Sequence, residues 1–171
     1  MNDAMTPEAA VAQLAASLLA HEVDASILAS LQQPETAAIL KQIEPSAQEL
    51  LERPWSEGDY EDAAVEFCRL FVLSPSAPAR GAAYEEDDSL AVAGRIQFML
   101  DSGFLELPKT YQTLAPDHVA LLLLVYSSLG AEDAIQFKAD NLAWLPQFSA
   151  RLERESTHSF YQLAAKILQV V

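Results

Sequence analysis

Cysteine and histidine are scarce in this chain, which holds one cysteine and three histidines among 171 residues. The single cysteine, Cys68, cannot form a disulfide within the chain, and this favours a reducing compartment. A metal site needs several ligands, and only His21, His118 and His158 are available, with no Cys/His cluster. We therefore expect no metal site and interpret Cys68 as a small hydrophobic core residue.

Basic residues are also few, because 10 Lys and Arg stand against 25 Asp and Glu and give a formal net charge of −15. A field of that sign repels duplex nucleic acid and anionic membrane surfaces. We expect no nucleic-acid partner and favour a partner that is cationic or has a cationic end.

Long apolar runs and a basic leader are missing as well. The unbroken apolar run at residues 119–125 is far too short to span a bilayer. The first eight residues are acidic and carry no Lys or Arg, which is the wrong charge for a secretory signal. These features predict a soluble cytoplasmic protein without stable membrane insertion.

Signatures of common enzyme classes are absent from the sequence. It has no glycine-rich phosphate loop and no Gly-x-Ser-x-Gly elbow. An adjacent Asp and His could suggest a metal hydrolase, but the further ligands are missing. We expect no catalytic residues, no cofactor and no enzymatic activity, and keep a metal- or nucleotide-dependent hydrolase as the weakest alternative.

Apolar residues recur at helical spacing along most of the chain, and no sustained alternating or β-branched run is present. We predict an all-α protein with one domain over residues 1–171 and no repeat. Polar residues of the amphipathic segment 57–72, Glu66 among them, are expected mostly off its buried stripe. Starts or stops are predicted at Thr6, Asp24, Pro34, residues 85–88, Gly103, Pro146 (a kink or an interruption), and Ser156 or Thr157.

The most informative stretch is residues 114–124, where Pro116, Asp117 and His118 precede a run of leucines. Proline suits the first position of a helix, because its missing N–H would have no partner there. Asp117 is then expected in the first turn, where unpaired amides and the helix dipole favour its charge. The pattern predicts a polar pair that is held by a buried helix and is available to a ligand.

Three segments in order resemble the TorD/NarJ-type chaperones that mature molybdoenzymes. Residues 59–78 (DYEDAAVEFCRLFVLSPSAP), followed by Tyr84, are similar to the family's acidic aromatic helix and its proline loop. Residues 116–119 (PDHV) resemble its Pro-Asp-His motif. Residues 137–148 (FKADNLAWLPQF), with THSFY at residues 157–161, look like its C-terminal block. Residues 1–53 match only as generic helix.

The resemblance implies a compact TorD-like bundle of about ten helices, as a monomer or a domain-swapped homodimer. It implies a cytoplasmic chaperone that binds the twin-arginine signal peptide of an apo-molybdoenzyme, or the apoenzyme itself, until the cofactor is inserted. Such a peptide has a basic end and an apolar middle, which suits an acidic helical protein.

Six residues are the candidates for client binding under this resemblance. For Asp117 and His118, a purely structural role at the helix start is about as well supported, and a fixed carboxylate can also accept from an arginine. Ordinary core packing is the stronger interpretation of Phe71 and Trp144. The full candidate set is Asp117, His118, Pro116, Tyr84, Phe71 and Trp144. A generic helical adaptor for an unrelated protein remains the main alternative function.

Overall fold

The structure is a computed structural model that describes residues 6–84 and 89–171, and those residues form ten α-helices and no named strand. The all-α prediction is confirmed. A π-helical turn, η1 (Cys68–Val72), extends α5, and 3₁₀ turns occupy Gly81–Ala83 and Lys109–Tyr111. The α-helices are α1 (Pro7–Leu19), α2 (Ala25–Leu31), α3 (Pro34–Ile43), α4 (Ala47–Glu52), α5 (Glu57–Phe67), α6 (Ser89–Asp101), α7 (Val119–Ser127), α8 (Ala131–Asn141), α9 (Leu145–Glu155) and α10 (Ser159–Leu168).

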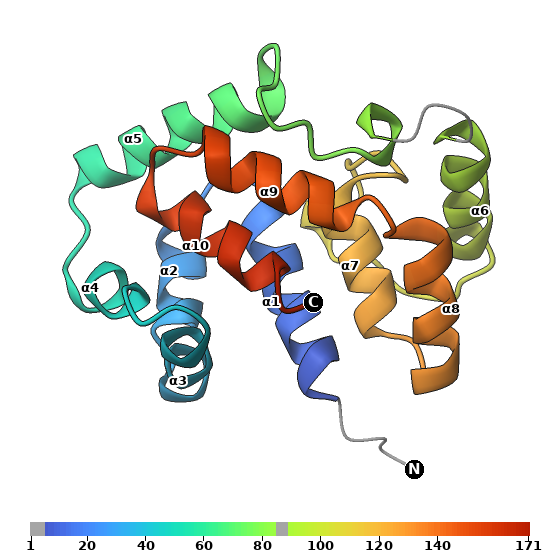
Figure 1. The fold of residues 1–171 in the computed structure, drawn as a ribbon, viewed down its shortest axis with the longest axis horizontal. Coiled ribbons are helices and arrows are strands. Elements are labelled where there is room, and N and C mark those ends of the chain that lie inside the picture. Colours follow the sequence, from blue (N-terminus) through green and yellow to red (C-terminus); the bar gives the residue numbers. More distant parts are fainter. Residues whose placement is uncertain (1–5, 85–88) are drawn as a thin grey trace.

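Helices α1 and α7 pack against each other at the centre of the molecule (Figure 1). Every residue of α7 from Val119 to Val125 is buried, so this helix has no polar face. The facing side of α1 carries Ala12, Ala15 and Ala16, all fully buried. Such small side chains let two helix backbones approach closely, which closes the core around the leucines of α7.

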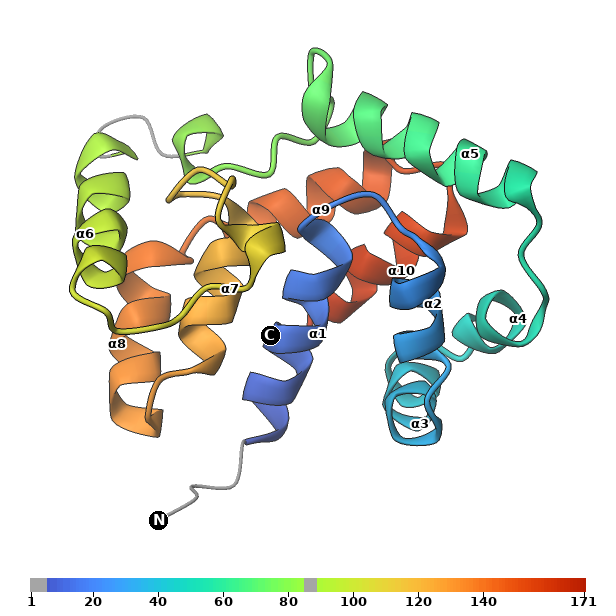
Figure 2. The same cartoon turned by 180° about the vertical axis from the view of Figure 1, so that it is seen from behind.

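The remaining helices lie around this pair. Helices α2, α3 and α4 form one end of the molecule, and α6 and α8 form the other (Figures 1 and 2). Helices α9 and α10 form an adjacent pair, and α10 also packs on α1. Helix α5 and its extension η1 cross over α9 and α10, and they bury Ala63 and Leu70 respectively.

Most predicted helix starts are confirmed, because they depend on local capping. Thr6 accepts a hydrogen bond from the amide of Ala9 at 3.2 Å, and Asp24 accepts one from Ile27 at 2.8 Å. Pro34 is the first residue of α3. The predicted stop at Gly103 is also found, with a positive φ of 76° that favours glycine. The predicted start at residues 85–88 lies outside the described residues.

Two boundaries in the C-terminal part refine or correct the expectations. Pro146 interrupts rather than kinks the helix, because α8 ends at Asn141 and the proline stands in the first turn of α9. The predicted cap of the last helix at Ser156 or Thr157 is wrong. His158 is the N-cap of α10, and its Nδ1 accepts from the amide of Phe160 at 3.2 Å.

Candidate functional site

Two segments that are far apart in the sequence, residues 79–81 and 117–119, pair side by side at the start of α7. The amide of Val119 donates to the carbonyl of Ala79 at 2.8 Å, and the amide of Gly81 donates to the carbonyl of Asp117 at 3.0 Å. These bonds form an isolated antiparallel bridge between Arg80 and His118. The loop at residues 73–80, which contains Pro75 and Pro78, is thereby fixed against the start of the central helix α7.

Pro116 does not begin a helix, which corrects the sequence expectation. The amide of His118 donates to the carbonyl of Ala115 at 2.9 Å and closes a turn with proline at its second position. Helix α7 begins at Val119, so Asp117 precedes the helix and is not in its first turn. The proline therefore sets a turn that aims the next two side chains in different directions.

Asp117 is 1 % exposed and is satisfied from within the chain. Its Oδ1 accepts from Nε and Nη2 of Arg80, each at 2.8 Å, and its Oδ2 accepts from the amide of Ala82 at 3.1 Å. The Arg80 side chain remains 55 % exposed. Asp117 thus holds the turn at residues 80–82 in place, and a ligand at this surface would contact Arg80 rather than the carboxylate.

His118 is the N-cap of α7, and its Nδ1 accepts from the amide of Ala120 at 3.2 Å. A neutral ring with an acceptor at Nδ1 carries its proton on Nε2. Burial lowers the pKa of His118 to about 4, although the charge of Asp117 raises it, and Arg80 lowers it further. Within the described part of the chain, Nε2 makes no hydrogen bond. The ring is therefore a neutral donor with a free N–H.

A groove of about 560 Å³ borders His118, between the α1–α2 connection and the end of α5. Phe67, Phe71, Val72 and Leu114 form an apolar wall, and the exposed carboxylates Glu22 and Asp24 stand at the rim. Of the six predicted residues, this groove contains Phe71 and His118. The lining residues are Ala20, His21, Glu22, Val23, Asp24, Phe67, Phe71, Val72, Leu114 and His118.

The π-helical turn η1 supplies one wall of the groove. The amide of Leu73 donates to the carbonyl of Cys68 at 2.8 Å, five residues back, which is the bond that defines a π turn. Phe71 packs on Phe67 with a centroid distance of 5.1 Å and on Tyr161 at 5.7 Å. Such turns occur often at functional sites, and this one brings two consecutive residues, 71 and 72, to the same groove.

Tyr84 and Trp144 lie together but outside the groove. Their rings stack with centroids 5.2 Å apart and an interplanar angle of 10°. Trp144 is 1 % exposed, and its Nε1 donates to the carbonyl of Asn141 at 3.0 Å. Trp144 is thus a core residue, which agrees with the interpretation preferred from the sequence. Its ring packs against Tyr84 at the end of the turn at residues 81–84.

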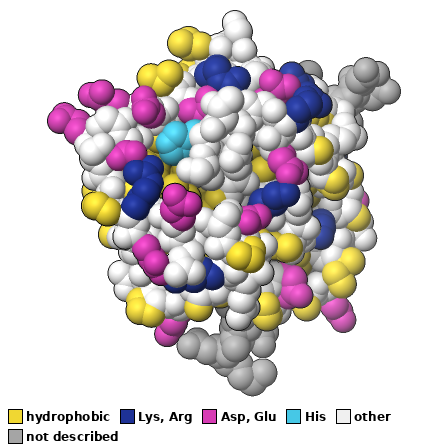
Figure 3. Space-filling view, turned by 60° about the vertical axis from the view of Figure 1, so that its left-hand side comes forward, with side chains coloured by type: hydrophobic (Ala, Val, Ile, Leu, Met, Phe, Trp, Pro, Cys, Tyr) yellow, Lys and Arg dark blue, Asp and Glu magenta, His cyan; other side chains and the backbone are white. Residues whose placement is uncertain are grey.

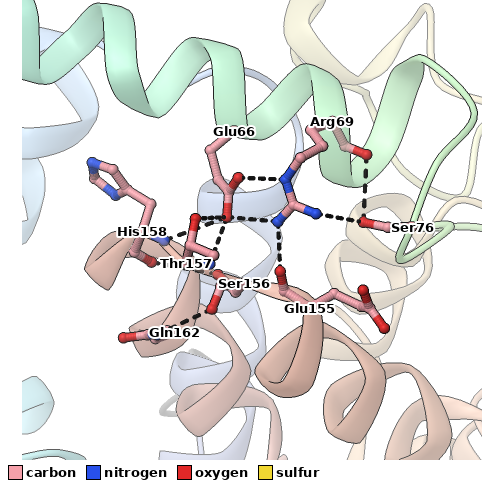
Figure 4. A network of polar contacts seen from close by, with 8 residues as sticks. All are labelled: Glu66, Arg69, Ser76, Glu155, Ser156, Thr157, His158 and Gln162. Atoms are coloured by element: carbon pink, nitrogen blue, oxygen red, sulfur yellow. Dashed lines mark hydrogen bonds and ion pairs between the residues drawn. The ribbon is translucent and has the colours of Figure 1, made fainter.

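Glu66 lies outside the groove and is a buried charged residue that sequence reasoning missed (Figure 4). The sequence pattern places it off the buried stripe of its helix, yet it is only 6 % exposed. Its Oε1 accepts from the amide of Thr157 at 2.6 Å and from the amide of His158 at 3.3 Å, and Arg69 donates to both of its oxygens. The carboxylate therefore joins α5 to the start of α10.

Burial opposes the ionisation of Glu66, but hydrogen bonds from Arg69 and Thr157 outweigh it and lower its pKa to about 2. The only sequence signal for this role was an acidic residue three positions before an arginine on a helix. That spacing does not distinguish a surface pair from a buried one.

Cys68 also differs from the expectation. It is partly exposed rather than a core residue, and its Sγ lies 3.8 Å from Oε1 of Glu22 at the rim of the groove. The turn of η1 places this thiol at the edge of the groove.

Comparisons with known proteins give no match to a family model, a curated protein or a solved structure. The resemblance to the maturation chaperones therefore depends on the sequence motifs. Among the described residues, no group of three or more His, Cys, Asp or Glu side chains could hold a metal ion. In the same part of the chain, every helix is too short or too polar to cross a membrane.

Proposed function

We propose that this protein is a chaperone of the TorD type, which holds an apolar segment with a cationic end, such as the twin-arginine signal peptide of an apo-molybdoenzyme. The observation that carries the proposal is the groove beside His118. Its apolar walls are formed by Phe67, Phe71, Val72 and Leu114, and carboxylates stand at its rim. Capture keeps the client segment out of water until the cofactor has been inserted.

The charge of the protein supports this choice of client. The formal net charge of −15 attracts a cationic peptide at long range and raises its rate of encounter. Acidic side chains are spread over the face in Figure 3, with basic side chains between them. Glu22 and Asp24 then bring negative charge to the mouth of the groove itself.

His118 adds a hydrogen-bond donor beside the apolar wall of the groove. An apolar segment has no side-chain acceptors, so a main-chain carbonyl is the group that the Nε2–H can bind. An extended segment offers such carbonyls at every residue, and a helix offers them only in its last turn. This one bond fixes the position of the segment along the groove, whereas apolar contacts alone would let it slide.

The test is a titration of the purified protein with a fluorescent twin-arginine signal peptide. Val72→Asp places a charge in the apolar wall and should weaken binding about tenfold or more. Ile135→Asp is the matched control, because Ile135 is 74 % exposed on α8, which contributes no residue to the groove. Equal affinity of the two variants would contradict binding in this groove.

A control peptide separates the chaperone from a generic helical adaptor. It keeps the apolar stretch and replaces both arginines by alanine. The chaperone proposal expects the wild-type protein to prefer the arginine peptide. If both peptides bind equally well, an adaptor that recognises apolar segments is the better description.

A further inference from the structure

The solvent side of α5 and η1 carries apolar residues where a surface helix is usually polar. Val65 is 70 % exposed and Val72 is 55 % exposed. Cys68 lies between them and is partly exposed. The spacing of residues 65, 68 and 72 places the three on one side of the helix. Single exposed apolar residues are common, but the three in this row recur at helical spacing on one side.

The row begins at the groove. Val72 belongs both to the row and to the groove wall. Cys68 lies against Glu22, which stands at the rim of the same groove, with Sγ and Oε1 3.8 Å apart. A segment that leaves the groove past Val72 therefore meets Cys68 next and Val65 after it.

Carboxylates flank the row, and the nearby arginine is already engaged. Glu61 and Asp62 are exposed on α5, one turn before Val65. Arg69 donates to both oxygens of Glu66, at 2.8 Å and 2.9 Å, so its charge is largely offset. The surface therefore alternates apolar groups with net negative charge.

This alternation matches the chemistry of arginine. An arginine side chain packs its methylene stem on apolar surface and extends a planar guanidinium, which carboxylates bind in bidentate fashion. We propose that the outer face of α5 binds the paired arginines of the client, with Val65 and Cys68 against the stems and Glu22, Glu61 and Asp62 around the guanidinium groups. The proposal rests on the function proposed above, and it adds where and how the basic end is bound.

The test is a double-mutant cycle between protein and peptide. Glu61→Gln with Asp62→Asn should weaken binding of the twin-arginine peptide roughly fivefold, because two exposed charge pairs are lost. For the alanine-substituted peptide, the affinity of this variant should equal the affinity of the wild-type protein, because the coupling needs both the carboxylates and the arginines. The matched control is Glu132→Gln with Asp133→Asn, an exposed acidic pair on α8.

The outcomes are distinguishable from failure of the proposed function. If the wild-type protein does not bind the twin-arginine peptide, both proposals are overturned. Suppose that the wild-type protein binds this peptide. If the α5 variant then has the same affinity for it as the α8 control, or loses affinity equally for both peptides, only the arginine site on α5 is overturned.

The single cysteine of the chain gives a second readout. Cys68 can be labelled with a benzophenone maleimide and irradiated in the presence of the twin-arginine peptide. The cross-link should map to the arginines or to their immediate neighbours. A cross-link confined to the apolar middle of the peptide would overturn the proposed direction of the segment.

Discussion

At the scale of single residues, His118 and Asp117 are adjacent in sequence but have different roles. Asp117 is sealed beneath the loop by Arg80 and the amide of Ala82. His118 uses Nδ1 to cap α7 and keeps Nε2 free beside the groove. One ring thus caps a helix and, in the proposed function, also donates to the client, and the two roles can be separated by the choice of substitution.

His118→Asn separates them. Asparagine is among the best N-caps, so the start of α7 should be retained and the free energy of unfolding should change by less than about 1 kcal/mol. The amide does not replace the Nε2–H, so affinity for the twin-arginine peptide should fall several-fold, as expected for one hydrogen bond of roughly 1 kcal/mol. Urea unfolding and peptide titration measure the two effects.

His118→Ala is the companion variant, because it removes both the cap and the donor. It should lose about 1 kcal/mol of stability as well as affinity. Wild-type affinity in His118→Asn would show that the ring serves the helix alone.

At the scale of elements, the buried carboxylate of Glu66 holds α5 against α10. It satisfies the amides of Thr157 and His158, which precede α10 and have no partner within that helix. It also orients Arg69, whose guanidinium reaches the carbonyl of Glu155 and the hydroxyl of Ser76. The pair of Glu66 and Arg69 therefore connects α5 and η1 with the loop around Ser76 and with the α9–α10 connection.

Glu66→Gln should expose this role through its pH dependence. The pKa of Glu66 is lowered to about 2 from a usual 4.5, so its charge stabilises the fold fully above pH 4.5 and loses that effect as the pH falls toward 2. The free energy of unfolding of the wild type should exceed that of the variant by roughly 3 kcal/mol or less at pH 7, and this difference should disappear between pH 4.5 and 2. Urea midpoints measured across that range test it. A gap that does not change with pH would mean that the charge of Glu66 is unimportant.

The elements also show which features the sequence could predict. Asp24 and Pro34 mark helix starts through contacts within four residues, so local reasoning located them correctly. Asp117 was misplaced because its partner Arg80 is 37 residues away in the sequence. The burial of Glu66 was missed because Thr157 is 91 residues away. Local capping can be read from a sequence, whereas pairing of distant loops is decided by packing.

At the scale of the whole molecule, the acidic charge opposes folding and favours the proposed client. A net charge of −15 on 171 residues repels itself in the compact state. The same field attracts a cationic peptide from solution. Both effects have one physical origin, so a higher ionic strength should weaken both of them, which raises the stability of the protein and lowers its affinity for the client.

Raising NaCl from about 0.05 M to 0.5 M shortens the Debye length severalfold and screens both effects. The urea midpoint of the free protein should rise, because self-repulsion is weakened, while the pair between half-exposed Arg80 and buried Asp117 is screened less than a fully exposed pair. Affinity for the twin-arginine peptide should fall over the same range, and affinity for the alanine-substituted peptide should change little. If the affinities of both peptides respond alike, binding is governed by the apolar groove, and the acidic surface has no part in selecting the client.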